Sequence, residues 1–558
     1  MCYSWGDINL KEKRETMEHP SNPLLRQVAS GWLEGIRSPE HSVLCWLGIP
    51  YAAPPVGPLR WRAPQDPIPW EGIRPAKQFG PVSVQKQGTA VVGSEDCLYL
   101  NVFRPDTQET LSVFFFIHGG NNQTDSGQLM DGPLMADALH AVVVTINLRL
   151  GALGWLNIKA IRTGDPLEDS GNFGLLDIKK SLSWVHENIQ SFGGDAGNLT
   201  VCGYSSGSRD LLCMLISPLF RGSFSRAVTF SGGFTTTDPE KGASIATKAL
   251  ARLVVEDGKA PDLPSAAAWL DSASPEVRDY LMGVDALRFG PLMAGAAIRM
   301  AVFPHLFADG ATIPKEGFQV LARGESYQVP MMVLSGGHEF TANANSDPAF
   351  QGADFTDPQV VEEYRFVTRY GSALFGYING EQNAKAFSAQ LGQPPVYAGR
   401  CLWGMNPEVT GELGSMRMGG AHGLDLFLTM GIERPSYAVT PEVFTSRNRP
   451  GREALAQVYR QYLSNFVHTG DPNGAGLPQW EPWDNREGGP KLLLLDADNT
   501  APVVRMTADW VEEEKIFQEI LADCTLPEDR KTFLMEHVLN GRFFSDNLDP
   551  FWAKAKQG

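Results

Sequence analysis

The chain contains 558 residues, of which 43% are hydrophobic and 20% are charged. This balance is typical of a globular protein, and the length allows a large core that needs no disulfide or metal to hold it together. The 64 acidic and 47 basic side chains give a net charge of −17, which argues against a protein that binds nucleic acid or anionic membranes.

Residues 1–24 are polar and are predicted to form an N-terminal extension, without the apolar stretch that a signal peptide needs. The seven cysteines include no CxxC pair. This pattern is typical of reduced thiols, so we expect a cytoplasmic protein. Every apolar run is far shorter than the roughly 20 residues of a membrane-spanning helix, so no membrane association is expected.

The main domain is predicted over residues 25–507. Its first part is rich in glycine and proline, which favour short strands and turns. Farther along, apolar runs rich in β-branched and aromatic residues alternate with helical patterns such as DIKKSLSWVHENIQ at 177–190. The expected strands lie at 98–103, 113–117, 141–147, 199–202, 227–230 and 330–334. This alternation predicts an α/β fold with a large, mostly parallel central sheet flanked by helices.

Two segments of this domain, around 235–330 and 345–410, are more helical and irregular than their surroundings. We expect them to be cap insertions that cover the sheet. The final segment, 508–558, is strongly helical and charged, and it predicts a helical C-terminal extension.

The stretch GYSSG at 203–207 fits the pattern G-x-S-x-G. It follows an apolar run and opens an apolar segment, the strand–turn–helix context in which this motif exposes a nucleophilic serine. Side chains two positions from the nucleophile would clash in such a tight turn, so glycines are needed there. Ser206 as nucleophile would place Tyr204 and Ser208 at those positions. Ser205 is therefore the candidate nucleophile, although the motif alone also fits an ordinary turn.

A second loop offers hydrogen-bond donors. In FFFIHGGNN, a strand is expected to end at Ile117, and Gly119, Gly120 and Asn121 follow it closely. Serine attack on a carbonyl builds an oxyanion, and the loss of one N–H donor to that oxyanion costs about 2.7–4 kcal/mol. Two glycines in a strand–helix loop are common, but beside a serine elbow they are the expected second element of an acyl-transfer site.

A nucleophilic serine also needs a base and an acid that orients the base. In this architecture the acid and then the histidine follow the serine in the chain. Of the five histidines after Ser205, His422 lies among small residues in MGGAHGLDLF, which leave room for its imidazole to approach the serine. Glu339, in the loop after an expected strand, is the candidate acid. The chemistry requires neither a metal nor an organic cofactor.

Taken together, these features resemble the type-B carboxylesterase/lipase family. The resemblance covers most of residues 25–505 and is carried by several long fragments in the same order. These include LGIPYAAPPVGPLRW at 47–61, GSEDCLYLNVFRP at 93–105, NLRLGALGWL at 147–156 and the stretch from 171 to 207. The resemblance implies an α/β-hydrolase fold with helical cap insertions.

The same resemblance implies a role for each candidate residue. Ser205, Glu339 and His422 occupy the catalytic triad positions. Gly120, Asn121 and the backbone N–H of Ser206 occupy the oxyanion-hole positions, and Gly119 and Tyr204 are candidates for substrate binding.

Several positions differ from the family pattern. Asn121 replaces the third glycine of H-G-G-G, and asparagine is a non-glycine residue that adopts positive φ readily. Tyr204 and Ser206 replace the usual glutamate and alanine beside the nucleophile. In secreted relatives the cysteine equivalent to Cys97 forms a disulfide with a position that is Ser83 here, which supports a reducing compartment.

We therefore expect a serine carboxylesterase that hydrolyses carboxylic esters of small, mainly apolar molecules through an acyl-enzyme intermediate. Its partner is a small-molecule ester substrate, and neither nucleic acid nor membrane is expected to bind. The sequence leaves the oligomeric state open. It also leaves open an acyltransferase or lactonase on the same scaffold, or a non-catalytic partner-binding relative.

Overall fold

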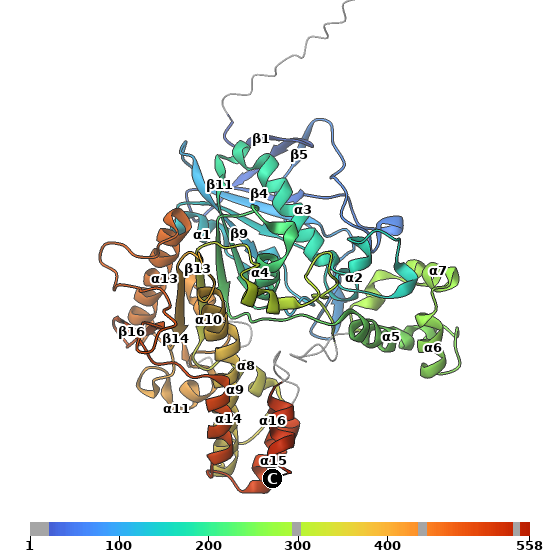
Figure 1. Cartoon of the computed structure of the whole chain (residues 1–558). Coiled ribbons are helices and arrows are strands. Elements are labelled where there is room, and N and C mark those ends of the chain that lie inside the picture. Colours follow the sequence, from blue (N-terminus) through green and yellow to red (C-terminus); the bar gives the residue numbers. More distant parts are fainter. Residues whose placement is uncertain (1–21, 293–302, 433–442, 540–546, 558) are drawn as a thin grey trace, which may run out of the picture.

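The computed structural model describes residues 22–292, 303–432, 443–539 and 547–557. Most of the expected N-terminal extension, residues 1–21, and part of the first expected cap, residues 293–302, lie outside these ranges. Within the described residues the order of the main sheet is β16-β15-β14-β13-β12-β11-β9-β10-β8-β4-β3 (Figure 1).

The strands of this central sheet have the following bounds: β3 (Ile36–Arg37), β4 (Val43–Pro50), β8 (Tyr99–Pro105), β9 (Leu111–Ile117), β10 (Val142–Ile146), β11 (Gly194–Tyr204), β12 (Arg226–Phe230), β13 (Met331–Gly336), β14 (Val396–Cys401), β15 (Leu492–Ala497) and β16 (Pro502–Thr507). Neighbouring strands from β10 through β9, β11, β12, β13 and β14 to β15 pair in parallel, and the outer pairs are antiparallel. The expected mostly parallel sheet is thus confirmed.

Two further sheets are small. One contains β1 (Leu25–Val28), β2 (Gly31–Glu34) and β5 (Ile73–Pro75), and the other is the hairpin of β6 (Gln85–Gln87) and β7 (Ala90–Val92). Both are built from the turn-rich N-terminal part of the chain, where glycine and proline prevent long elements.

The described helices are α1 (Gly132–Leu139), α2 (Gly151–Gly154), α3 (Phe173–Asn188), α4 (Ser206–Ile216), α5 (Pro239–Glu256), α6 (Leu263–Asp271), α7 (Pro275–Gly283), α8 (Thr341–Ser346), α9 (Pro358–Gly376), α10 (Gln382–Ser388), α11 (Pro407–Met418), α12 (Leu424–Thr429), α13 (Arg449–Thr469), α14 (Glu513–Ala522), α15 (Glu528–Leu534) and α16 (Leu548–Ala555).

Strand β9 shows why the sheet is buried on both faces. Val113 and Phe115 pack into the hydrophobic core under α3 and α4, whereas Phe114 and Phe116 pack into a second core under α1, α12 and α13. Successive side chains of a strand point to opposite faces, so a strand covered on both sides must be apolar at every position. The run VFFFI at 113–117 satisfies this requirement, and the one polar residue of the strand, Ser112, bonds His468.

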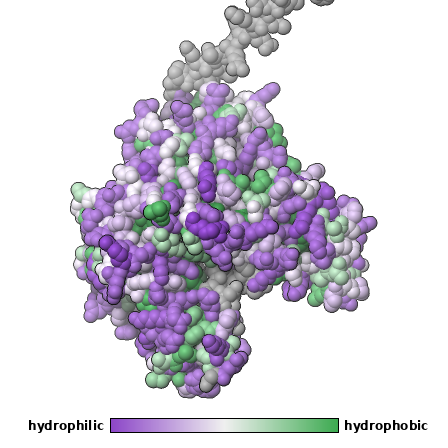
Figure 2. All heavy atoms as spheres, in the orientation of Figure 1, coloured by the Kyte–Doolittle hydropathy of each residue, from purple (hydrophilic) through white to green (hydrophobic). Residues whose placement is uncertain are grey.

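A third core lies in the lower lobe of the molecule, where α8 and α9 pack against α14, α15 and α16 (Figure 1). The helices of the C-terminal segment thus cover part of the segment 345–410. That segment also contains β14, so its last part belongs to the central sheet and is not cap. The division of the chain into a main domain, caps and extensions otherwise stays a prediction. Polar residues cover much of the face shown in Figure 2, as the charge balance requires.

A buried ion pair joins the loop after β10 to α3. The guanidinium of Arg149 donates to both carboxylate oxygens of Asp177 at 2.9 and 2.7 Å, and the Arg149 backbone N–H donates to the same group at 3.0 Å. Both side chains are almost wholly inaccessible to solvent. Removing one partner of such a pair leaves a buried charge unpaired.

We expect Asp177→Ala to lower the free energy of unfolding by about 3–5 kcal/mol, because Arg149 then stays buried without its carboxylate. Urea denaturation followed by circular dichroism measures the change. Asp66→Ala is the matched control, since Asp66 pairs with Lys180 of the same helix α3 but is 90% exposed. Equal losses for the two variants would contradict the assignment.

Candidate functional site

Ser205 lies at the turn between β11 and α4, with φ 53° and ψ −113°. A non-glycine residue rarely adopts such a conformation, and here the surroundings impose it. The Ser205 N–H donates to the carbonyl of Phe230 at 2.8 Å. A Cβ on Gly203 would lie 2.3 Å from the Gly207 carbonyl oxygen, and a Cβ on Gly207 would lie 2.3 Å from that of Ile117. The turn therefore requires both glycines of the motif.

The three side chains that the sequence singled out are in hydrogen-bond contact. His422 Nε2 lies 3.0 Å from Ser205 Oγ, and His422 Nδ1 lies 2.5 Å from Glu339 Oε2. An ionised carboxylate only accepts hydrogen bonds, so the proton is on Nδ1, and Nε2 accepts from the serine hydroxyl. This geometry suits a base that removes a proton from a nucleophile.

Glu339 is completely buried, and protein donors surround its carboxylate. Oε1 accepts from Ser231 Oγ at 2.5 Å and from the Gly336 N–H at 2.6 Å. Burial by itself would raise the pKa of Glu339, but His422 and the bonds from Gly336 and Ser231 outweigh it and hold the pKa below its usual value. The group is therefore kept as an anion behind the imidazole.

A second carboxyl group lies near this pair. Asp425, in the first turn of α12, is fully buried, and its Oδ1 accepts from the Leu426 N–H at 2.9 Å. Burial raises the pKa of Asp425 to about 7, and the negative charge of Glu339 adds to the effect. Around neutral pH Asp425 is therefore partly protonated, which limits the charge repulsion beside Glu339.

The expected oxyanion donors lie on two sides of Ser205. Gly120 has φ 85° and Asn121 has φ 56° in the loop after β9, and Ser206 opens α4. Among the described residues, no protein acceptor takes the N–H groups of Gly120, Asn121 or Ser206. The N–H groups at the start of a helix also carry the positive end of its dipole, which favours negative charge.

Tyr204 packs among the site residues and is only 7% exposed. Its ring lies 5.6 Å from the His422 ring and 5.9 Å from that of Phe427 between centroids. A Cβ on Gly119 would lie 2.7 Å from the Tyr204 ring, so this glycine makes room for the tyrosine. Both residues therefore contribute to packing around the imidazole, and their role in substrate binding stays a prediction.

The other histidines downstream of Ser205 have different partners, and within the described ranges none of them contacts Ser205 or Glu339. His305 contacts Arg209, His338 contacts the backbone of Ser415, His468 in the last turn of α13 contacts Ser112 and the Leu139 carbonyl, and His537 contacts Phe533.

Sequence reasoning missed four residues around the site: Ser231, Asn122, Arg209 and Asp210. Ser231 follows β12 and bonds Glu339 directly. Arg209 bonds the Asn121 side chain, and Asp210 bonds that of Asn122. The sequence did carry a signal for Arg209 and Asp210, because two adjacent charged residues in the otherwise apolar run SRDLLCMLI are unusual for a buried helix.

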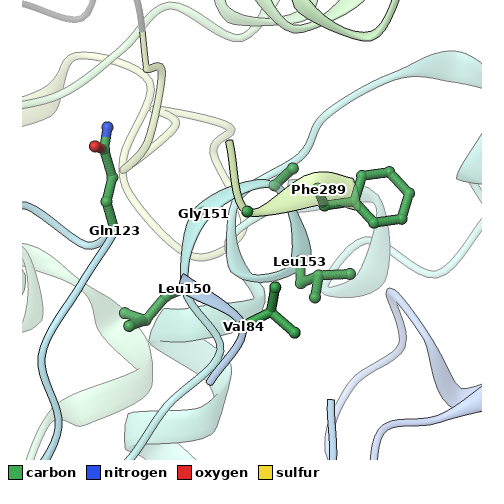
Figure 3. A pocket seen from close by; sticks show the side chains of 8 residues that line it. Val84, Gln123, Leu150, Gly151, Leu153 and Phe289 are labelled. Atoms are coloured by element: carbon green, nitrogen blue, oxygen red, sulfur yellow. The ribbon is translucent and has the colours of Figure 1, made fainter. Parts of the chain in front are cut away.

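A small cavity lies next to the oxyanion loop (Figure 3). Gln123 of that loop, the residues of α2 and Phe289 after α7 contribute to its lining. Apart from Gln123 and two glycines, the lining is apolar: Val84, Leu150, Ala152, Leu153 and Phe289. Its volume of about 10 Å³ is room for roughly one water molecule.

In the part of the chain that the structure describes, no group of three or more His, Cys, Asp and Glu side chains is arranged to hold a metal ion. No described helix combines the length and the apolar character needed to cross a membrane.

Comparison with known proteins gives a consistent result. The family model described as "Carboxylesterase family" matches residues 22–394. The para-nitrobenzyl esterase of Bacillus subtilis (strain 168) is 34% identical over 307 residues, which cover 53% of this chain and 59% of that protein. Liver carboxylesterase 1 of Oryctolagus cuniculus is 27% identical over 552 residues, which cover 87% of this chain and 90% of that protein.

Among solved structures, the carboxylesterase EST55 of Geobacillus stearothermophilus is similar to this chain with a TM-score of 0.67 and 27% identity. The match covers 87% of this chain and 98% of that one. These neighbours confirm the α/β-hydrolase fold that the sequence resemblance implied.

We expect Ser231→Ala to lower Tm at neutral pH because the buried Glu339 anion loses a hydroxyl donor. A carboxyl whose pKa is lowered in the folded state contributes stability above its unfolded pKa, and this contribution is lost as the pH falls through the folded pKa. The Tm difference between wild type and variant should therefore shrink below about pH 4, the usual range of a free glutamate. Differential scanning calorimetry across pH 3.5–8 measures it.

Ser225→Ala is the matched control, since its hydroxyl donates to the neutral carbonyl of Gly197 at 2.7 Å. Its Tm difference should not depend on pH in this range. A pH-independent deficit in Ser231→Ala as well would contradict the role of Ser231 as a partner of ionised Glu339.

Proposed function

The chain belongs to the carboxylesterase family, and we propose that it hydrolyses carboxylic esters through an acyl-enzyme formed on Ser205. The family and the named relatives make it a carboxylic ester hydrolase. The observation that carries the proposed mechanism is the pair of contacts of His422, 3.0 Å to Ser205 Oγ and 2.5 Å to Glu339 Oε2.

In the acylation step, His422 Nε2 takes the proton of Ser205 while Oγ attacks the ester carbonyl carbon. The π-electron pair of the carbonyl moves to its oxygen, and the N–H groups of Gly120, Asn121 and Ser206 stabilise the resulting oxyanion. When the tetrahedral intermediate collapses, the ester C–O bond breaks and His422 protonates the departing alcohol.

In the deacylation step, a water molecule takes the place of the alcohol. His422 removes its proton as the water oxygen attacks the acyl carbon, and the returning proton releases Ser205 and the carboxylic acid. During both steps the imidazole becomes positively charged, and Glu339 stabilises this charge while it fixes the orientation of the ring. No protein group other than the triad has to change its protonation state.

For the substrate we propose esters of small, mainly apolar molecules. This is supported by the apolar side chains of Leu150, Leu153 and Phe289, which line the small cavity that Gln123 of the oxyanion loop borders (Figure 3). The preassembled contacts of Ser205 with His422 favour a hydrolase over a non-catalytic scaffold.

We further propose that the protein works in the reducing environment of the cytoplasm. Cys97 is fully buried as a free thiol, and its side-chain hydrogen-bond partner is Ser83. A serine at this place prevents the disulfide of secreted relatives. Burial raises the pKa of the Cys97 thiol to about 12, so the thiol stays protonated and unreactive.

We expect Ser205→Ala to reduce kcat for a short-chain nitrophenyl ester by roughly 10⁶-fold, the scale for removing such a nucleophile. Tm should stay nearly unchanged, because alanine keeps the backbone and Cβ of serine. Steady-state kinetics and thermal melts of the purified variant check both. Mass spectrometry of the wild type after reaction with a serine-reactive phosphonate should place the adduct on Ser205.

Ser206→Ala separates the two adjacent serines. It removes a hydroxyl that has no hydrogen-bond partner among the described residues but keeps the backbone N–H. We expect this variant to form the phosphonate adduct and to turn over the ester. Retained turnover in Ser205→Ala, or an adduct on Ser206, would reject the assignment of the nucleophile.

A further inference from the structure

Two charged residues of α4 are buried next to the oxyanion loop. Arg209 is 3% exposed and Asp210 is fully buried. Charged side chains are almost never this deeply buried unless partners hold them. The proposed hydrolysis as described above uses neither of them, so their position needs another explanation.

Besides the contact of Arg209 with His305, each of the two side chains bonds one of two consecutive residues of the loop. Arg209 Nη2 donates to Asn121 Oδ1 at 2.7 Å, and Asp210 Oδ1 accepts from Asn122 Nδ2 at 2.8 Å. Burial lowers the pKa of Arg209 only to about 10, so the guanidinium stays a cationic donor at neutral pH. Burial raises the pKa of Asp210 to about 7, so this carboxyl is partly protonated around neutral pH, and its Oδ1 accepts from Asn122 in either form. We call these four residues the asparagine clamp.

The loop needs such a clamp because of its backbone conformation. Asn121 and Asn122 both have φ 56°. Left-handed backbone is costly for residues with a Cβ, and two such residues in succession are unusual even for asparagine. Glycine would adopt this conformation without help, whereas asparagine needs contacts that hold it there. The side-chain amides of Asn121 and Asn122 supply the groups that form hydrogen bonds with Arg209 and Asp210.

The clamp also ties the loop to the nucleophile. The Arg209 N–H donates to the Ser205 carbonyl at 3.2 Å, which places the two residues one helical turn apart on the same side of α4. On its other side the loop is held by the Gly151 N–H, which donates to the Asn122 carbonyl at 2.8 Å. Serine and oxyanion donors are therefore fixed relative to one rigid helix.

We propose that Arg209 and Asp210 are positioning residues that hold the backbone N–H of Asn121 toward the oxyanion of the tetrahedral intermediate. This inference rests on the proposed function and deepens it. The two side chains act through Asn121 and Asn122 and touch no reacting atom. A donor that is held in place before the reaction needs no reorganisation when the negative charge develops.

A double-mutant cycle tests the proposal with a nitrophenyl ester as substrate. Arg209→Met should lower kcat by tenfold or more with KM changed by less than about threefold, because the lost interaction acts in the transition state. In the Asn121→Gly background, the same substitution should change kcat by less than about threefold, since glycine needs no clamp. Affinity for a trifluoromethyl ketone analogue of the ester should fall in parallel with kcat.

A purely structural role predicts a different result. Arg209→Met would then reduce activity equally in both backgrounds, and this outcome would overturn the proposal. Wild-type turnover and its loss in Ser205→Ala are measured with the same substrate. They test the hydrolytic function itself, so that its failure is distinguishable from failure of the clamp.

Two further pairs of variants keep the test decisive if Arg209→Met does not fold. Asn121→Ala leaves α4 intact and should have a kcat at least tenfold below that of Asn121→Gly. Alanine has neither the side-chain amide of asparagine, which Arg209 holds, nor the backbone freedom of glycine to adopt positive φ. Asp210→Asn keeps an acceptor for Asn122 and should rescue most of the kcat that Asp210→Ala loses. Equal kcat values within both pairs would reject the clamp.

Discussion

The tight turn at Ser205 is the constraint on which the rest of the site depends. The chain leaves the centre of the parallel sheet at the end of β11 and enters α4 with a single residue at φ 53° between them. The hydroxyl is thereby exposed at the carboxyl edge of the sheet, while Gly203 and Gly207 allow neighbouring backbone to approach. The oxyanion loop, Ser231 and Glu339 follow β9, β12 and β13 at this same edge, whereas His422 lies farther along the chain, between α11 and α12.

The charge of Glu339 then determines whether Ser205, at this turn, can act as a nucleophile. Glu339 is an anion without access to water, and the end of β12 and the end of β13 both supply donors to it through Ser231 and Gly336. The ends of two strands of the sheet therefore orient Oε1 of the carboxylate, and Asn379 of the segment 345–410 donates to Oε2 at 3.5 Å. The hydrogen bond from Nδ1 to this anion fixes the tautomer of His422. Its second nitrogen, Nε2, is therefore unprotonated and can act as the base for Ser205.

Much of this arrangement could be predicted from the sequence. The strands β9, β10, β11, β12 and β13 were predictable because strands buried on both faces must be continuously apolar. Strand β14 was not, since VYAGRC contains a glycine and an arginine and follows helices. Its arginine, Arg400, is tolerated because it pairs with Glu381, a contact between segments that no local pattern reveals.

The residues of the candidate site likewise fall into those that the sequence predicts and those that it does not. Ser205, Glu339 and His422 carry motif signals, because their chemistry demands particular neighbours in the chain. Ser231 carries none, and the charges of SRDLLCMLI mark Asp210 only as unusual, since the roles of both residues come from side chains 108 and 88 residues away in sequence. The replacement of a glycine by Asn121 was visible as a departure, but the groups that compensate for it could be identified only in three dimensions.

Several functional features lie on the single helix α4, and this limits which substitutions the protein can accept as it adapts. One short helix carries the end of the nucleophile turn, a proposed donor to the oxyanion, and the arginine and aspartate of the asparagine clamp. Most substitutions in α4 would alter several of these features together. Gradual adaptation by single substitutions in this helix is therefore unfavourable. New substrate preferences are expected to arise in the segments proposed as caps, which do not set the turn. A laboratory selection for altered specificity should accordingly leave 203–210 untouched while its accepted changes accumulate elsewhere.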